Sequence, residues 1–230
     1  MRFLLPAVSS VLLVAFLLCA DARPVYSNQY PASGNGVEDS GTAASAPVHI
    51  MAFGDSLTAG YGLANAHSFP AVLEGELLGM GYNVRVTNAG VSGDTSAGGA
   101  ARIAWALESA PELLILELGA NDALQGISPD VTRTNLAAIL ESCRAHGVTV
   151  LLAGMHAPRN MGEDYAARFD ALYPDLAREY GVALYPFFLE GVALDRTLNL
   201  DDGMHPNAAG VRVIVSRMAP VVAGMLDALR

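Results

Sequence analysis

The sequence predicts a three-layer α/β/α domain built on a mostly parallel, five-stranded sheet. Short apolar runs of the length of buried strands alternate along the chain with longer amphipathic segments of the length of helices. Several of the apolar runs stop at glycine-rich turns, which is typical of a chain that passes repeatedly from strand to helix. Crossovers of this kind are right-handed, so they place helices on both faces of the sheet.

The start of the chain has the pattern of an export signal. Residues 3–20 carry no charge and follow Arg2, and small residues at Ala20 and Ala22 flank a possible cleavage point. We expect residues 1–22 to be a secretory signal peptide, with an uncleaved membrane anchor as the alternative. Residues 23–47 are rich in Pro, Ser, Gly and Asn and are expected to form a flexible linker. The folded domain is then expected over residues 48–230, periplasmic or secreted, without stable membrane insertion after cleavage.

Composition restricts the classes of partner. The net charge is -10 and no basic cluster occurs, so the sequence offers no electrostatic surface for nucleic acid or an anionic membrane. Cys19 falls in the expected signal, which leaves Cys143 without a disulfide partner. Cys143 continues an apolar helical stripe through Leu136 and Leu140, which favours a packed thiol over a nucleophile.

Five segments have the pattern of strands. Four are short and mostly apolar, and of these the first and third are expected to be buried. The second alternates apolar and polar residues like a half-exposed edge strand. The expected strands are residues 48–53, 82–87, 113–118, 148–153 and 182–185.

Helices are expected between and after these strands. The first covers residues 69–78 and ends at glycines, and the second begins near Ser96, which can cap it together with its two predecessors. Ser128 and Pro129 open the helix that contains Cys143. A further helix covers residues 164–180, with a possible kink at Pro174. Pro206 is expected to start the last helix, whose apolar face comprises Val211, Ile214, Val215, Met218, Val222 and Met225.

Three polar turns follow the first three strands. Ser56 comes after the first strand, the Ser92-Gly93 turn after the second and Asn121 after the third. Ligands of parallel α/β sheets bind beyond the carboxyl ends of the strands, where the strand order reverses. If these three strands are neighbours, the three turns meet at one end of the sheet and form the candidate site.

A second group of polar residues supplies an acid and a base. Asp202 and His205 are three residues apart, so the carboxylate can hold the imidazole in one tautomer and leave its other nitrogen free to accept a proton. Ser56 is the candidate nucleophile, which gives a catalytic triad in the order Ser, Asp, His. The backbone N–H of Ser56, the backbone of Gly93 and the side-chain amide of Asn121 are candidate oxyanion donors.

Each of these residues also has a structural interpretation. Ser56 and Gly93 are ordinary turn residues, and Asn121 with Asp122 can form a loop-and-cap pair. Asp55 and Asp94 are interpreted as caps and loop ties. A metal held by the carboxylates and imidazole of residues 201–205 is the alternative to a triad, but this loop falls short of a metal-ligand set, and we expect neither a metal nor a cofactor.

These residues lie in four blocks that resemble the motifs of the GDSL, or SGNH, hydrolase superfamily. The blocks are residues 54–57 (Gly-Asp-Ser-Leu), 88–95 (Asn-Ala-Gly-Val-Ser-Gly-Asp-Thr), 119–122 (Gly-Ala-Asn-Asp) and 202–207 (Asp-Gly-Met-His-Pro-Asn), in the order of that superfamily. The match runs from residue 48 to the C-terminus and looks most like the bacterial exported thioesterase I, arylesterase and lysophospholipase L1 group.

The resemblance implies a flavodoxin-like fold and metal-free hydrolysis of an ester or thioester through an acyl-enzyme. It places Ser56, Asp202 and His205 in the triad and Ser56, Gly93 and Asn121 in the oxyanion hole. The implied substrate is a small-molecule acyl ester, thioester or lysolipid. Ala157 departs from the larger apolar residue that relatives often carry there. A carbohydrate O-deacetylase of the same superfamily and a non-catalytic exported binding module are the alternatives.

Overall fold

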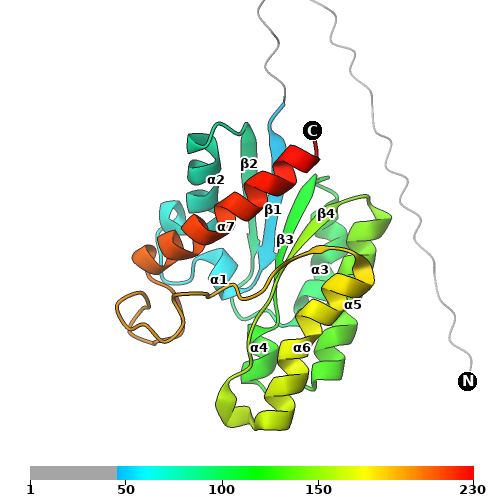
Figure 1. Ribbon diagram of the computed structural model, residues 1–230, viewed down its shortest axis with the longest axis vertical. Coiled ribbons are helices and arrows are strands. Elements are labelled where there is room, and N and C mark those ends of the chain that lie inside the picture. Colours follow the sequence, from blue (N-terminus) through cyan, green and yellow to red (C-terminus); the bar gives the residue numbers. More distant parts are fainter. Residues whose placement is uncertain (1–45) are drawn as a thin grey trace, which may run out of the picture. The chain divides into compact units, whose positions relative to one another are not determined.

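A computed structural model describes residues 46–230, so the expected signal peptide and nearly all of the expected linker lie outside the described residues. Within this part of the chain, five strands form one sheet in the order β2-β1-β3-β4-β5, and every neighbouring pair is parallel (Figure 1). This is the flavodoxin-like strand order, and it confirms the predicted three-layer architecture. The strands are β1 (Val48–Gly54), β2 (Val84–Gly90), β3 (Leu113–Glu117), β4 (Thr149–Ala153) and β5 (Ala183–Tyr185).

Helices cover both faces of the sheet. In Figure 1, α2 and α7 lie together on one face, and α3, α5 and α6 lie on the other. Two very short helices, α1 and α4, directly follow β1 and β3. The α-helices are α1 (Ser56–Ala59), α2 (Phe69–Gly79), α3 (Ser96–Leu107), α4 (Ala120–Leu124), α5 (Pro129–Ala145), α6 (Glu163–Tyr180) and α7 (Ala208–Ala228), with 3-10 turns η1 (Asn65–His67) and η2 (Arg159–Met161).

The register of the sheet aligns the three strands that precede the candidate site. Gly54 at the end of β1 pairs with Gly90 of β2 on one side and with Glu117 of β3 on the other. The chain moves from β1 outward to β2 and then returns to the opposite side of β1 for β3, so the strand order reverses beside β1. The turns after these three strands therefore lie together at the carboxyl end of the sheet, as the sequence predicted.

Several boundaries differ from the sequence-based expectation. Strand β2 continues through Gly90, beyond the predicted turn at residue 88, because its last residues still pair with β1. Helix α7 starts at Ala208 rather than at Pro206, since Pro206 pairs in an isolated bridge with Asn199. Helices α1 and α4 were not predicted, because segments of four and five residues are too short to show an apolar period.

The sheet and the inner helix faces form one apolar core. The interior strands β1, β3 and β4 are almost wholly buried, whereas the edge strand β2 is only partly buried, as its alternating sequence predicted. Cys143 packs inside this core and has no exposed surface. Burial raises the pKa of its thiol to about 12, so it stays protonated at neutral pH. The thiol is therefore a packed side chain, as predicted.

Among the described residues, α7 is the only helix long and apolar enough to span a membrane. Half of the residues in its most apolar 18-residue stretch are buried inside the protein. Its inner face, which includes Val211, Ile214, Met218 and Val222, packs into the core described above. The apolar character of α7 is thus accounted for by its position on the sheet.

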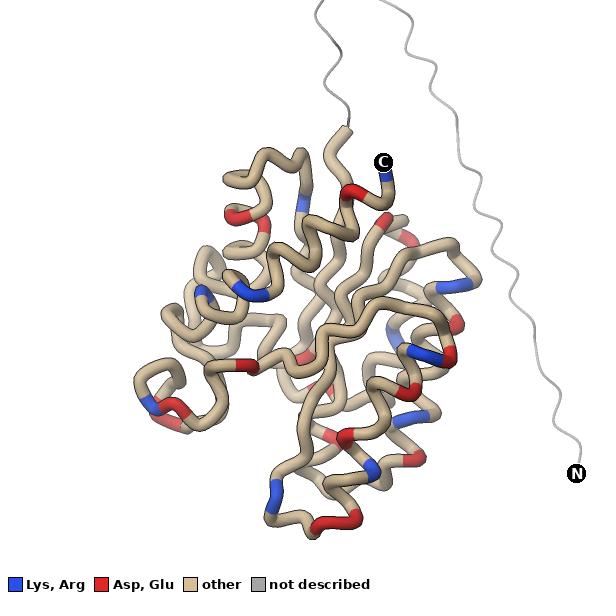
Figure 2. Tube along the Cα trace, viewed as in Figure 1, with Lys and Arg blue, Asp and Glu red and all other residues tan. Residues whose placement is uncertain are grey.

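Basic residues are spread over separate helices and loops of the described part rather than gathered along one segment (Figure 2). Most of them pair with a carboxylate, as Arg168 does with Asp130 and Arg178 with Asp175. These pairs lie at the surface, where each contributes on the order of 0–1 kcal/mol to stability.

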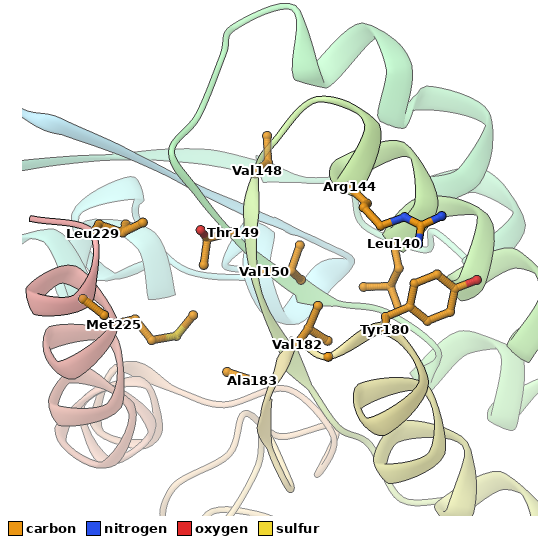
Figure 3. Close-up of a pocket in the computed structure, with 12 residues that line it drawn as sticks. Leu140, Arg144, Val148, Thr149, Val150, Tyr180, Val182, Ala183, Met225 and Leu229 are labelled. Atoms are coloured by element: carbon orange, nitrogen blue, oxygen red, sulfur yellow. The ribbon is translucent and has the colours of Figure 1, made fainter.

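A cavity of about 430 Å³ lies between the ends of α5, α6 and α7 (Figure 3). Its lining includes Val148, Val150 and Val182, which lie at or beside the amino ends of β4 and β5, together with Leu140 and Met225. None of the predicted site residues lines it, and it is at the opposite end of the sheet from the aligned turns. This cavity therefore does not belong to the candidate site.

Candidate active site

Ser56 is the first residue of α1, directly beyond the end of β1. The helix begins there because the side chain of Asp55 accepts a hydrogen bond from the backbone N–H of Leu57 at 2.9 Å and caps the first turn. Ser56 is only 9% exposed, so most of this residue is covered by its neighbours. The turn seen in the sequence is thus a short capped helix that fixes the direction of this side chain.

The side chains of Ser56, His205 and Asp202 lie in a row. The Nε2 of His205 is 3.0 Å from the Oγ of Ser56, and its Nδ1 is 2.7 Å from Oδ2 of Asp202. Residues 149 positions apart in the sequence are thereby within hydrogen-bond reach. This arrangement has the geometry in which a carboxylate orients an imidazole and the imidazole accepts a proton from a hydroxyl.

The loop that carries Asp202 and His205 is closed on itself. The backbone N–H of Leu200 donates to the carbonyl of His205 at 2.7 Å, and Asn199 forms a bridge with Pro206. Beyond the loop, the side chain of Asn207 caps α7 by accepting from two backbone N–H groups. The acid and the base are therefore held as one rigid segment at the start of α7.

Asp202 is kept ionised by its own loop. Its Oδ1 accepts hydrogen bonds from the backbone N–H groups of Met204, at 2.9 Å, and His205, at 3.0 Å. The backbone hydrogen bonds of His205 and Met204, followed by the imidazole, lower the pKa of Asp202 to about 2. The carboxylate is thus available to stabilise an imidazolium over the whole neutral range.

The backbone N–H groups of Ser56 and Gly93 are among those that have no acceptor in the described part of the chain. Gly93 lies in the loop between β2 and α3 with φ +85°, a backbone conformation that glycine adopts without strain. Unpaired amides at the end of a sheet are suitable donors for an oxyanion.

Asn121 joins the other two turns. As part of α4, it donates its Nδ2 hydrogens to Oδ2 of Asp55 at 3.0 Å and to the carbonyl of Asp94 at 2.8 Å. Asp55 precedes Ser56 and Asp94 follows Gly93, so the amide of Asn121 is bonded to the sequence neighbours of the other two candidate donors. Both of its hydrogens are donated in this structure, so a bound oxyanion would replace one of these acceptors or share a hydrogen with it.

A buried pair of acids lies beneath Ser56. Glu117, the last residue of β3, has no exposed surface, and its Oε2 accepts from Thr58 at 2.8 Å and from the N–H of Asp55 at 3.3 Å. Its Oε1 has no partner among the described residues. A Cβ at Gly54 would lie 2.5 Å from this carboxyl, which explains the glycine there. Burial and the neighbouring Asp55 raise the pKa of Glu117 well above its usual range, and burial raises that of Asp55 to about 6.

Three residues near the site were not predicted from the sequence. Tyr61 places its ring 4.5 Å from the imidazole of His205. Arg102 contacts the ends of β1 and β2 and the loop after β2. Glu117 could have been found, because it is a charged residue within an otherwise apolar strand. Tyr61 and Arg102 gave no comparable signal, since aromatic and charged residues are common in surface loops and helices.

The remaining candidates lie apart from this row. Asp201 is exposed, and no group of three His, Cys, Asp or Glu residues suited to a metal occurs in residues 46–230. His156, in the loop after β4, has its Nδ1 3.2 Å from Asp170, a partner that is remote in sequence. Asp55 and Asp94 act as a helix cap and a loop tie, as interpreted from the sequence.

Known proteins that are similar to this chain are esterases and related hydrolases. Residues 52–213 match the GDSL-like Lipase/Acylhydrolase family. The chain is 39% identical to "Esterase TesA" of Pseudomonas aeruginosa over 77% of this chain and 89% of the relative. It is also 39% identical to "Thioesterase 1/protease 1/lysophospholipase L1" of Escherichia coli, over 74% of this chain and 81% of that relative. Among solved structures, AlinE4, an SGNH-hydrolase family esterase, superposes with a TM-score of 0.67 at 49% identity, covering 78% of this chain and 97% of that one.

Proposed function

Since the chain belongs to the GDSL-like lipase/acylhydrolase family, whose curated relatives are ester-hydrolysing serine hydrolases, we propose that it hydrolyses carboxylic esters or thioesters through an acyl-serine intermediate on Ser56. The observation that carries the mechanism is the row of Ser56, His205 and Asp202, with contacts of 3.0 and 2.7 Å. No cofactor or metal enters this scheme.

In the proposed acylation step, Nε2 of His205 accepts the proton of Ser56 while Oγ attacks the acyl carbonyl. The carbonyl oxygen becomes an oxyanion, and Asp202 stabilises the imidazolium. The tetrahedral intermediate then collapses, the bond to the leaving group breaks, and the alcohol or thiol departs with the proton from His205. A water molecule, deprotonated by the same imidazole, then attacks the acyl-serine. The bond between the acyl carbon and Oγ breaks, Oγ takes the proton back from His205, and the carboxylic acid is released.

We assign the oxyanion to the backbone N–H groups of Ser56 and Gly93 and to the side-chain amide of Asn121. The first two have no acceptor among the described residues, which supports their availability. The amide of Asn121 is bonded to the sequence neighbours of both, and we expect an oxyanion to accept the hydrogen that it donates here to Asp55. Loss of one such donor typically costs about 10²–10³ in rate, so each assignment can be tested separately.

The substrate class follows from the relatives by analogy. Their names describe an esterase, an arylesterase and a thioesterase with lysophospholipase activity. We propose that this chain acts on small-molecule esters, thioesters or lysolipids of the same kind.

Hydrolysis of nitrophenyl acetate and butyrate tests the proposal. Ser56→Ala should lower kcat by several powers of ten, because the nucleophile is removed. Ser216→Ala is a matched control, since this exposed serine on α7 bonds only to the carbonyl of Val213. Near-normal turnover by Ser56→Ala would refute the mechanism. A panel of acetylated sugars, acyl thioesters and lysophospholipid then separates the esterase from a carbohydrate O-deacetylase.

We also propose that the enzyme is exported, on the basis of the uncharged run at residues 3–20. Cell fractionation of the full chain, with mass determination of the product, tests this point. A protein that keeps residues 1–22 and stays in the cytoplasm would contradict it.

A further inference from the structure

Arg102 connects three segments around the proposed oxyanion site. From α3, its Nη2 donates to the carbonyl of Gly54 at 2.9 Å and its Nη1 to the carbonyl of Ala89 at 2.9 Å. Its Nε donates to Oδ2 of Asp94 at 2.7 Å. The guanidinium carbon also lies 3.8 Å from the ring centroid of Phe53. A single side chain thus holds the ends of β1 and β2 and the loop that follows β2.

Two of the three acceptors of Arg102 are close in sequence to the backbone donors of the proposed oxyanion hole. Gly54 is two residues before Ser56, and Asp94 directly follows Gly93. The carbonyl of Gly54 also accepts from the N–H of Val91 at 3.0 Å, so the loop after β2 is attached to the end of β1 at two points.

We propose that Arg102 is a positioning residue that sets the distance between the N–H groups of Ser56 and Gly93 around the oxyanion. The inference rests on the proposed function, because it concerns the rate of the same reaction. Arg102 touches no reacting atom and acts through the backbone that it holds.

The geometry of the guanidinium explains why arginine occupies this position. Its nitrogens form a planar fork that meets three acceptors in three directions, whereas the ammonium of lysine is a single point. Gly93 is exposed, and a Cβ placed on it would meet nothing within 4 Å, so no side-chain packing restrains this position. Arg102 adds a restraint to the loop through Asp94, the next residue.

Asn121 extends the same network to the third proposed donor. Its bond to the carbonyl of Asp94 joins α4 to the residue whose carboxylate Arg102 holds. Displacement of the Asp94 segment would therefore shift Gly93 and Asn121 together. Misplacement of catalytic groups by about 1 Å can cost on the order of 10² in rate, so a modest movement here is expected to be visible in kcat.

Arg102→Met tests the proposal, because it keeps an apolar stem over Phe53 and removes the fork. We expect kcat for nitrophenyl butyrate to fall about 10- to 100-fold while KM changes by less than about threefold. The affinity for butylboronic acid, whose boron bonds to Ser56 and mimics the tetrahedral intermediate, should fall by the same factor as kcat/KM. The affinity for butyrate should not change.

Arg102→Lys should recover part of kcat, because it retains one donor and the charge. Arg133→Met is the matched control, since Arg133 also lies on a helix and pairs with Glu179 at the surface; it should leave kcat and boronate affinity unchanged. If Arg102→Met does not fold, Asp94→Asn weakens the Nε contact and should show the same pattern of lower kcat with constant KM.

A folded Arg102→Met enzyme with wild-type kcat and boronate affinity would overturn the inference, even if its melting temperature were lower. That result is distinct from failure of the proposed function, which would appear as activity that survives Ser56→Ala.

Discussion

The ring of Tyr61 lies beside the imidazole of His205, with 4.5 Å between centroids and 37° between planes. Tyr61 follows Gly60, the C-cap of α1. The short helix that begins at Ser56 therefore also places an aromatic ring beside the proposed base, His205. The ring limits the directions in which the imidazole can turn.

Tyr61→Ala should therefore lower kcat about fivefold, because an aromatic pair of this kind contributes about 1 kcal/mol to the preferred position of the imidazole. Tyr61→Phe keeps the ring and should retain wild-type kcat. Trp105→Ala, which removes an exposed aromatic side chain from α3, is the control. Equal rates for the Ala and Phe variants at Tyr61 would show that the ring does not act on His205.

Asp202→Asn should reduce kcat by about 10²–10⁴, because an amide neither fixes the tautomer of His205 nor stabilises its charge. Asp202 has a pKa of about 2, so the wild-type enzyme keeps this carboxylate ionised at every pH above 4. The adjacent exposed residue gives a matched control, Asp201→Asn, which should be fully active. Steady-state kinetics at pH 8 measure kcat for both variants. A larger loss of kcat in Asp201→Asn than in Asp202→Asn would refute the assignment of Asp202 as the acid.

Gly93→Ala should lower kcat at least tenfold, because alanine at φ +85° is strained and shifts the proposed amide donor. Gly147 offers a comparison, since it has φ +68° and, like Gly93, open space where a Cβ would lie. Both variants should lose about 1 kcal/mol of stability in denaturant unfolding. A parallel loss of kcat in Gly147→Ala would mean that strain alone, and not the donor, explains the effect.

Glu117→Gln should change how stability depends on pH. Because the folded pKa of Glu117 is raised above the reference value of 4.5, the native state binds this proton more tightly than the unfolded chain. The free energy of unfolding of the wild type therefore falls as pH rises from 4.5 toward the folded pKa, and glutamine removes this contribution. The melting temperature of Glu117→Gln relative to wild type should increase across this window.

Differential scanning calorimetry between pH 5 and 9 measures the effect. Glu76→Gln, on an exposed position of α2, should show no such trend. A constant difference between Glu117→Gln and wild type at all pH values would indicate that Glu117 is ionised in the native state.

The main features of the fold were predictable because burial leaves a clear pattern. The apolar runs at β1, β3 and β4 have lengths that only buried strands explain, and the alternation in β2 marked it as an edge. The candidate site could be assembled because its residues directly follow strands that proved to be neighbours. The pairing of Asp202 with His205 was visible because both belong to one loop.

The rest depends on contacts between distant segments. Arg102 contacts Gly54 and Ala89, which are 48 and 13 residues away, and no local sequence pattern predicts such hydrogen bonds. Glu117 acquires its role only because β3 pairs with β1 and brings its carboxyl under Asp55. The start of α7 shifted by two residues because Pro206 pairs with Asn199, a bridge that the local preference of proline does not indicate.

The closed loop of Asp202 and His205 has one consequence for control of the enzyme. Since the carboxylate and imidazole belong to one loop, a displacement of that loop away from α1 would break the 3.0 Å contact with Ser56 and the ring contact with Tyr61 but leave the 2.7 Å contact between Asp202 and His205 intact. Such an open form would be inactive yet fully assembled, ready to resume turnover on closing.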